Sequence, residues 1–189
     1  MAYMYSVPER IADGTVHVLG IASSITATAL LIVYAAQTQS GIDVAAVSIY
    51  GAVATFAFMA SAIYHMTPWS RARPWLQRID HAAIYLKIAG TYTPLVVILG
   101  SAYAYGVLAA VWAVALGCAV GKLTQWLQPG VVSTCGYAAL GWASVLLLWP
   151  MMEVLPSSAL WLMLTGGVIY TAGSAINHLE NVRYNVAVW

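Results

Sequence analysis

The side chains that could carry chemistry in this 189-residue chain are few, and they lie near the ends of apolar runs. Ser61 and His65 are four residues apart, so a helix would place them on one face about 6 Å apart. Asp80 follows the next polar break in the sequence. An imidazole, a hydroxyl and a carboxylate are groups that a hydrolytic site uses. We therefore treat Ser61, His65 and Asp80 as candidate functional residues.

A second pair, Asp13 and His17, has the same spacing near the N-terminus. Other interpretations stay open for each residue. A carboxylate at a helix N-terminus caps free amides, which would explain Asp13 and Asp80 without any enzyme. A histidine at a membrane interface is often only solvated. The residues alone offer one good metal ligand, His65, and one good carboxylate, whereas catalytic zinc needs three protein ligands.

The composition identifies the solvent in which these residues must work. Hydrophobic residues make up 62% of the chain and charged residues only 7%, whereas soluble domains carry about 25% charged residues. The net charge of +1 gives no indication of a nucleic-acid partner. The sequence therefore predicts an all-α integral membrane protein whose partners are membrane lipids.

Apolar runs bounded by polar, Pro and Gly residues predict the spans. Each run is close to the roughly 20 residues that a helix needs to cross a bilayer. The N-terminal segment lacks the pattern of a signal peptide, so we expect the first run to stay as a transmembrane helix. The predicted spans cover residues 14–36, 44–66, 81–100, 103–122, 132–150 and 157–178, in one transmembrane domain.

The basic residues predict an orientation. Six of the seven fall in connections on one side of the predicted spans, and the opposite connections contain only Asp43 and Glu153 as charged residues. By the positive-inside rule the basic side is cytoplasmic, and so is the N-terminus. The six residues are Arg10, Arg71, Arg73, Arg78, Lys122 and Arg183.

The four histidines also fall at this inner end. His17 and His65 join Asp13, Ser61 and Asp80 there, while we expect His81 to be a surface or packing residue. Asn177 and His178 end the sixth run. Lys87 lies seven residues after Asp80, on nearly the same helical face and about 10 Å deeper. It either shares a polar pocket with Asp80 or binds a carbonyl freed near Pro94.

Three segments together resemble the bacterial hemolysin III proteins, which belong with the progestin and adipoQ receptors and are related to the adiponectin receptors. They are Ser61-Ala-Ile-Tyr-His65, Arg78-Ile-Asp80-His81-Ala-Ala-Ile-Tyr85 and Ala89-Gly90-Thr91-Tyr92-Thr93-Pro94. The resemblance extends to Gly166-Gly-x-x-Tyr170 and to Asn185-Val-Ala-Val-Trp189, so it covers nearly the whole chain.

This resemblance implies a seven-transmembrane-helix bundle in the bacterial plasma membrane, with Zn²⁺ near the cytoplasmic face. It implies that His65 is a zinc ligand, that Ser61 lies beside the site and that Asp80 contacts the water at the metal. Two further histidine ligands are expected from a His-x-x-x-His motif in the seventh helix. The sequence ends at Trp189 before any such motif, so we expect six of the seven helices here and an incomplete zinc site.

One departure from the family pattern concerns the first span. The family usually has Asn one turn before its histidine, and this chain has Asp13 before His17. We carry over only a supporting role for this pair.

Three functions are compatible with these features. The first is a zinc-dependent hydrolase of lipid amide or ester bonds. The second is membrane lysis or pore formation, for which no span offers a continuous polar stripe. The third is a lipid-sensing receptor for membrane homeostasis that binds lipid without hydrolysing it.

Overall fold

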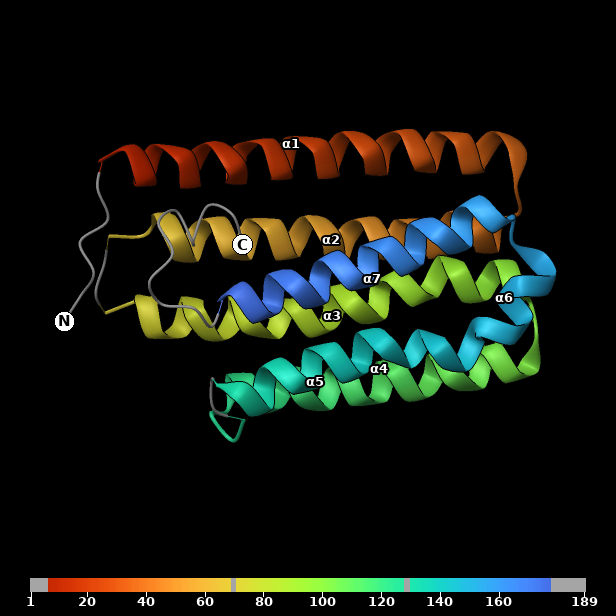
Figure 1. Ribbon diagram of the computed structural model, residues 1–189. Coiled ribbons are helices and arrows are strands. Elements are labelled where there is room, and N and C mark those ends of the chain that lie inside the picture. The colour runs from red at the N-terminus through yellow and green to blue at the C-terminus, as the bar shows by residue number, and fades with distance from the viewer. Residues whose placement is uncertain (1–6, 69–70, 128–129, 178–189) are drawn as a thin grey trace.

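The structure is a computed structural model that describes residues 7–68, 71–127 and 130–177, without the side chains of residues 131–132 and 174–177. Within these ranges every regular element is helical, which confirms the predicted all-α class. Four long helices come first (Figure 1). They are α1 (Val7–Thr38), α2 (Gly41–Met66), α3 (Arg73–Leu99) and α4 (Ala102–Leu123).

The second half of the chain is less regular. The fifth crossing is divided into α5 (Val131–Trp142), a 3₁₀ segment η1 (Ala143–Leu147) and α6 (Leu148–Val154), and α7 (Ser157–Asn177) follows. In the described part of the chain, α1 to α4 and the segment Ser133–Val154 are long and apolar enough to cross a bilayer. The expected seventh helix would follow Trp189 and lies outside the described residues, so the seven-helix count stays a prediction.

Two helices begin earlier than the apolar runs indicated. The described part of α1 begins at Val7 and α3 begins at Arg73, with Pro74 in its first turn. Proline is favoured there because the first amides of a helix have no acceptor within it. Asp13 and Asp80 therefore lie inside their helices, and the capping interpretation of both residues is wrong.

The interruption of the fifth crossing has identifiable causes. Pro150 has no amide hydrogen, so it cannot donate to the Leu146 carbonyl four residues earlier. The Tyr103 hydroxyl donates to that carbonyl instead, at 3.0 Å. The Tyr92 hydroxyl of α3 lies 2.8 Å from the carbonyl oxygens of both Leu140 and Gly141, where α5 ends. Tyrosine hydroxyls from neighbouring helices thus donate hydrogen bonds to backbone carbonyls, for which the bilayer core offers no donor.

Helix α3 lies at the centre of the bundle. It contacts α2 and α4 along its length and also meets α5 and α6 (Figure 1). Its Tyr85, Tyr92 and Val96 are among the most completely buried side chains of the described core, together with Leu147 of η1. Helix α1 lies at the edge of the row and packs on α2. Asp80 is therefore carried by the most enclosed helix of the bundle.

Small and polar residues set the approach of α1 to α2. A Cβ atom on Gly51 would overlap the Thr28 side chain, and one on Gly20 would lie 2.9 Å from the Phe58 ring. Between these contacts the hydroxyls of Ser24 and Thr55 are 3.0 Å apart. This close packing continues toward the end of the bundle where α1 begins and α2 ends.

That end also carries the Lys and Arg residues of the described chain other than Lys87, and we call it the basic end. It comprises the start of α1, the end of α2, the start of α3 and the end of α4 (Figure 1). Its basic residues are Arg10, Arg71, Arg73, Arg78 and Lys122.

Candidate functional site at the basic end

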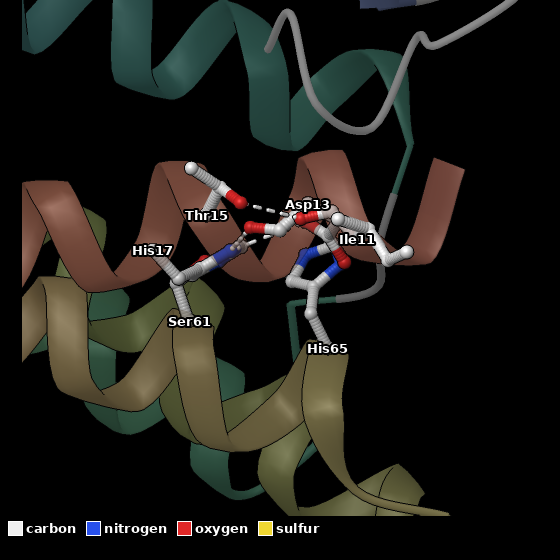
Figure 2. Close-up of polar contacts among 6 residues, drawn as sticks. All are labelled: Ile11, Asp13, Thr15, His17, Ser61 and His65. Atoms are coloured by element: carbon white, nitrogen blue, oxygen red, sulfur yellow. Dashed lines mark hydrogen bonds and ion pairs between the residues drawn. The ribbon is translucent and has the colours of Figure 1, made fainter. Parts of the chain in front are cut away.

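The last turns of α2 face the second and third turns of α1 at the basic end. The Nε2 atom of His17 lies 3.3 Å from the Ser61 hydroxyl oxygen, and the His17 and His65 ring centres are 5.2 Å apart. Figure 2 shows Asp13 between the two rings, with Ser61 beside His17. The spacing of four residues keeps each pair on one helical face, and the contacts of His17 with Ser61 and His65 put both pairs at the same depth.

Asp13 links the two histidines. Its Oδ1 atom is 3.1 Å from Nδ1 of His17, and its Oδ2 atom is 3.8 Å from Nδ1 of His65. Nδ1 of His17 also lies 2.8 Å from the Asp13 carbonyl oxygen, so this nitrogen is the donor. In a neutral imidazole Nε2 is then the acceptor, and it faces the Ser61 hydroxyl. Within the described chain, Oδ1 of Asp13 is buried without a well-aligned hydrogen bond.

Asp80 completes this group from α3. Its side chain is 8% exposed, and its polar neighbours are the Ser61 hydroxyl and His17. Tyr137 of α5 is a further electrostatic neighbour. The structure thus brings together the sequence-predicted residues of three helices. We call Asp13, His17, Ser61, His65 and Asp80 the polar cluster.

Two residues beside the polar cluster were not predicted as part of a site. The Tyr64 ring meets the His65 ring edge-on, with centres 4.9 Å apart. The Arg73 guanidinium carbon lies 5.6 Å from the centre of the Tyr64 ring. The sequence indicated only a topological role for Arg73. A usable signal was that Tyr64 precedes His65 directly and that Arg73 follows after one short connection.

Other candidate residues lie apart from the cluster. The His81 carbonyl accepts a hydrogen bond of 3.3 Å from the Tyr137 hydroxyl, and its half-buried side chain has Lys122 and His65 as electrostatic neighbours. The ammonium nitrogen of Lys87 lies 4.5 Å from the centre of the Phe58 ring, rather than on a carbonyl near Pro94. The side chain of Asn177 and all of His178 lie outside the described residues.

The donor set of the described chain fits one part of a zinc site. His65 is 26% exposed, and Asp13 faces its Nδ1 atom, so Nε2 is the nitrogen that a metal would take. However, no three His, Cys, Asp or Glu side chains among the described residues are grouped closely enough to hold a metal ion. A complete zinc site would need ligands from outside those ranges.

Comparison with known proteins identifies the family. A family model described as "Haemolysin-III related" matches residues 3–183. The "Hemolysin-3 homolog" of Bacillus subtilis (strain 168) is 30% identical over 187 residues, which cover 98% of this chain and 88% of that protein. "Hemolysin-3" of Bacillus cereus is 31% identical over 184 residues, covering 97% and 84%. No solved structure matches. The chain therefore belongs to the hemolysin III family of multi-pass membrane proteins.

Proposed function

We propose that this protein hydrolyses an amide or ester bond of a membrane lipid at the polar cluster, with zinc as its metal. The observation that carries the proposal is the convergence of Asp13, His17, Ser61, His65 and Asp80 from three helices. Ionisable residues inside membrane spans are costly and are usually kept for function. Two carboxylates and two imidazoles at one depth are difficult to explain by packing alone.

The residues of the chain divide the work as follows. A carboxylate oxygen of Asp80 takes a proton from the attacking water while the water oxygen bonds to the acyl carbon. Asp80 then returns that proton to the departing amine or alcohol as the carbon–nitrogen or carbon–oxygen bond breaks. The Ser61 hydroxyl lies between two acceptors, the Asp80 carboxylate and Nε2 of His17, and donates its one proton to either of them, so it keeps the two side chains adjacent. Asp13 fixes the ring of His17.

His65 is the residue of the polar cluster that would hold zinc, and the remaining ligands would come from outside the described residues. Bound zinc supplies polarisation of the acyl carbonyl and activation of a water molecule. Asp13, which faces Nδ1 of His65 at 3.8 Å, would orient the ring so that Nε2 points to the metal.

We also propose that the basic end is cytoplasmic. Its five basic residues contrast with the opposite end, where Asp43 is held by Ser40 at the start of α2 and Glu153 lies in α6. The positive-inside rule then gives a cytoplasmic N-terminus. In a cysteine-free background, Asp43→Cys should react with an impermeant maleimide added to intact cells, and Arg71→Cys should not. The reverse labelling would contradict the orientation.

Zinc content of the full-length protein tests the metal directly. Purified wild type should hold zinc near one ion per chain, and His65→Ala should lose most of it. His81→Ala is the matched control, because His81 is a half-buried histidine of the same end outside the polar cluster. Equal zinc contents of wild type and His65→Ala would contradict the assignment of His65 as a zinc ligand.

The printed names of the relatives favour a second candidate, lysis of membranes. The polar face of α1 is packed against α2 through the Ser24–Thr55 and His17–Ser61 contacts, so it does not line an open pore in the described bundle. Dye release from liposomes that persists in a His65→Ala, Asp80→Ala double variant would favour lysis over hydrolysis.

A further inference from the structure

A cation is held beside the polar cluster by an aromatic ring. Arg73 is exposed at the start of α3, and its guanidinium group lies over Tyr64, whose ring meets His65 edge-on. Arg73 is also an electrostatic neighbour of His65. One tyrosine ring thus separates an exposed guanidinium group from the candidate metal ligand.

No carboxylate of the described chain neutralises this cation. Arg73 forms no ion pair with the described residues: Asp13 faces the two histidines, and Asp80 lies beside Ser61. A guanidinium group that lies over a ring leaves N–H groups available to an anion, and their fork matches the geometry of a phosphate. The arrangement therefore offers a donor set for a phosphate.

The surroundings of Arg73 place it at the level of lipid head groups. Two residues further along α3, Trp75 is 57% exposed and lies under the guanidinium group of Arg78, with its ring centre 4.8 Å from the guanidinium carbon. Trp126, after α4, is 88% exposed. Exposed tryptophans are typical of the interface between head groups and acyl chains. At this level an anion that met Arg73 would be a lipid phosphate.

We propose that Arg73, oriented by Tyr64, recognises the head-group phosphate of an anionic phospholipid and so selects anionic phospholipids over lipids whose head group has no net charge. The inference builds on the proposed lipid hydrolase. In a glycerophospholipid a short glycerol unit separates the phosphate from the acyl carbonyls. A phosphate on Arg73 would place an acyl linkage within reach of His65 and Asp80.

A general attraction of cations to anionic membranes is the competing explanation. Arg10 provides the matched control, because it is an exposed arginine at the same end. Among the described residues it contacts no aromatic ring and forms no ion pair. If only net charge matters, Arg10→Gln and Arg73→Gln should weaken lipid binding equally. If the stacked guanidinium group matters, Arg73→Gln should weaken it far more.

Lipid binding can be measured without turnover in an Asp80→Asn background. Full-length protein is equilibrated in nanodiscs of phosphatidylcholine with a minor share of phosphatidylglycerol, and retained phosphatidylglycerol is counted by native mass spectrometry. Loss of one charge-assisted, bidentate contact should lower the retained lipid by about tenfold in Arg73→Gln. Arg73→Lys should be intermediate, Tyr64→Phe should match the parent, and Arg10→Gln should stay within about twofold of it.

Each result decides the proposal. Equal retention in Arg73→Gln and Arg10→Gln would overturn it, as would displacement of the lipid by an excess of inorganic phosphate, which would show a site for the free ion. Arg73→Lys, which keeps the charge and loses the fork, keeps the test valid if Arg73→Gln folds poorly. Lipid binding is measured in an inactive background, so its result does not depend on hydrolysis. Absence of lipid hydrolysis in the wild type would contradict the proposed function and would leave the binding result unaffected.

Discussion

The contact between Gly51 and Thr28 makes the packing of α1 on α2 testable. A Cβ on Gly51 would overlap Cγ2 of Thr28 and lie 2.6 Å from its Oγ1 and 2.8 Å from its Cβ. A threonine side chain is stiff in a helix, and its Cβ cannot rotate away. Gly51→Ala should therefore push α1 outward, at a cost of about 1–3 kcal/mol for overpacking.

The expected effect of Gly51→Ala can be measured as a thermal shift. For a chain of this size, each kcal/mol corresponds to roughly 2–4 °C in Tm, so Tm should fall by about 2–12 °C. Tryptophan fluorescence on heating the detergent-solubilised protein reports it. Gly106→Ala is the control, because an added Cβ there meets no atom within 4 Å. It should leave Tm unchanged or raise it, since alanine favours a helix over glycine.

A compensating change sharpens the test. Thr28→Ala removes the two nearest atoms and leaves Cβ at 2.8 Å, so the Gly51→Ala, Thr28→Ala double variant should recover part of the loss. Because the same interface positions His17 against Ser61, Gly51→Ala should also lower lipid hydrolysis more than Gly106→Ala does. Equal Tm values for Gly51→Ala and Gly106→Ala would refute the close packing.

Three further predictions concern single side chains. Asp13→Ala should lower hydrolysis by about tenfold or more because it removes the carboxylate that faces Nδ1 of His65, whereas Asp13→Asn keeps an acceptor there and should lose less; equal losses would contradict an orienting role. Tyr92→Phe leaves two carbonyls without the hydroxyl they share and should cost about 1–3 kcal/mol, measured as a fall in Tm larger than that of the more exposed Tyr103→Phe. Lys87→Met removes a half-buried ammonium group that lies over the Phe58 ring. Because a charge inside a span is costly, the substitution should raise Tm; a fall in Tm would indicate that Lys87 has a stabilising partner.

The sequence was most informative where a pattern is local. Apolar runs located the helices, because a bilayer imposes length and composition on each crossing. The spacing of Ser61 and His65, and of Asp13 and His17, placed each pair on one face, and the structure puts both pairs at one depth. The repeat of polar and small residues along α1 is visible in the sequence and marks the face that packs on α2, namely Asp13, His17, Gly20, Ser24 and Thr28.

Features that depend on contacts between distant segments were not predictable in this way. No local sequence pattern indicates that the Tyr92 hydroxyl donates to a carbonyl at the end of α5. Leu140, one of the two acceptors, is 48 residues away in the sequence. Capping looked sufficient for Asp13 and Asp80 because the polar first turns of α1 and α3 fall outside the apolar runs. Arg73 lies beside the polar cluster because the start of α3 packs near the end of α2. No local pattern in the sequence indicates that contact.

Release of fatty acid from acyl lipid is the measurement that tests the central claim most directly. Full-length protein in liposomes of defined phospholipid should release fatty acid, and Asp80→Ala should reduce the rate to background. Asp43→Ala should retain it, because Asp43 is a carboxylate at the opposite end, held by the Ser40 hydroxyl and amide. Equal rates for Asp80→Ala and wild type would contradict the assignment of the polar cluster as the site of hydrolysis.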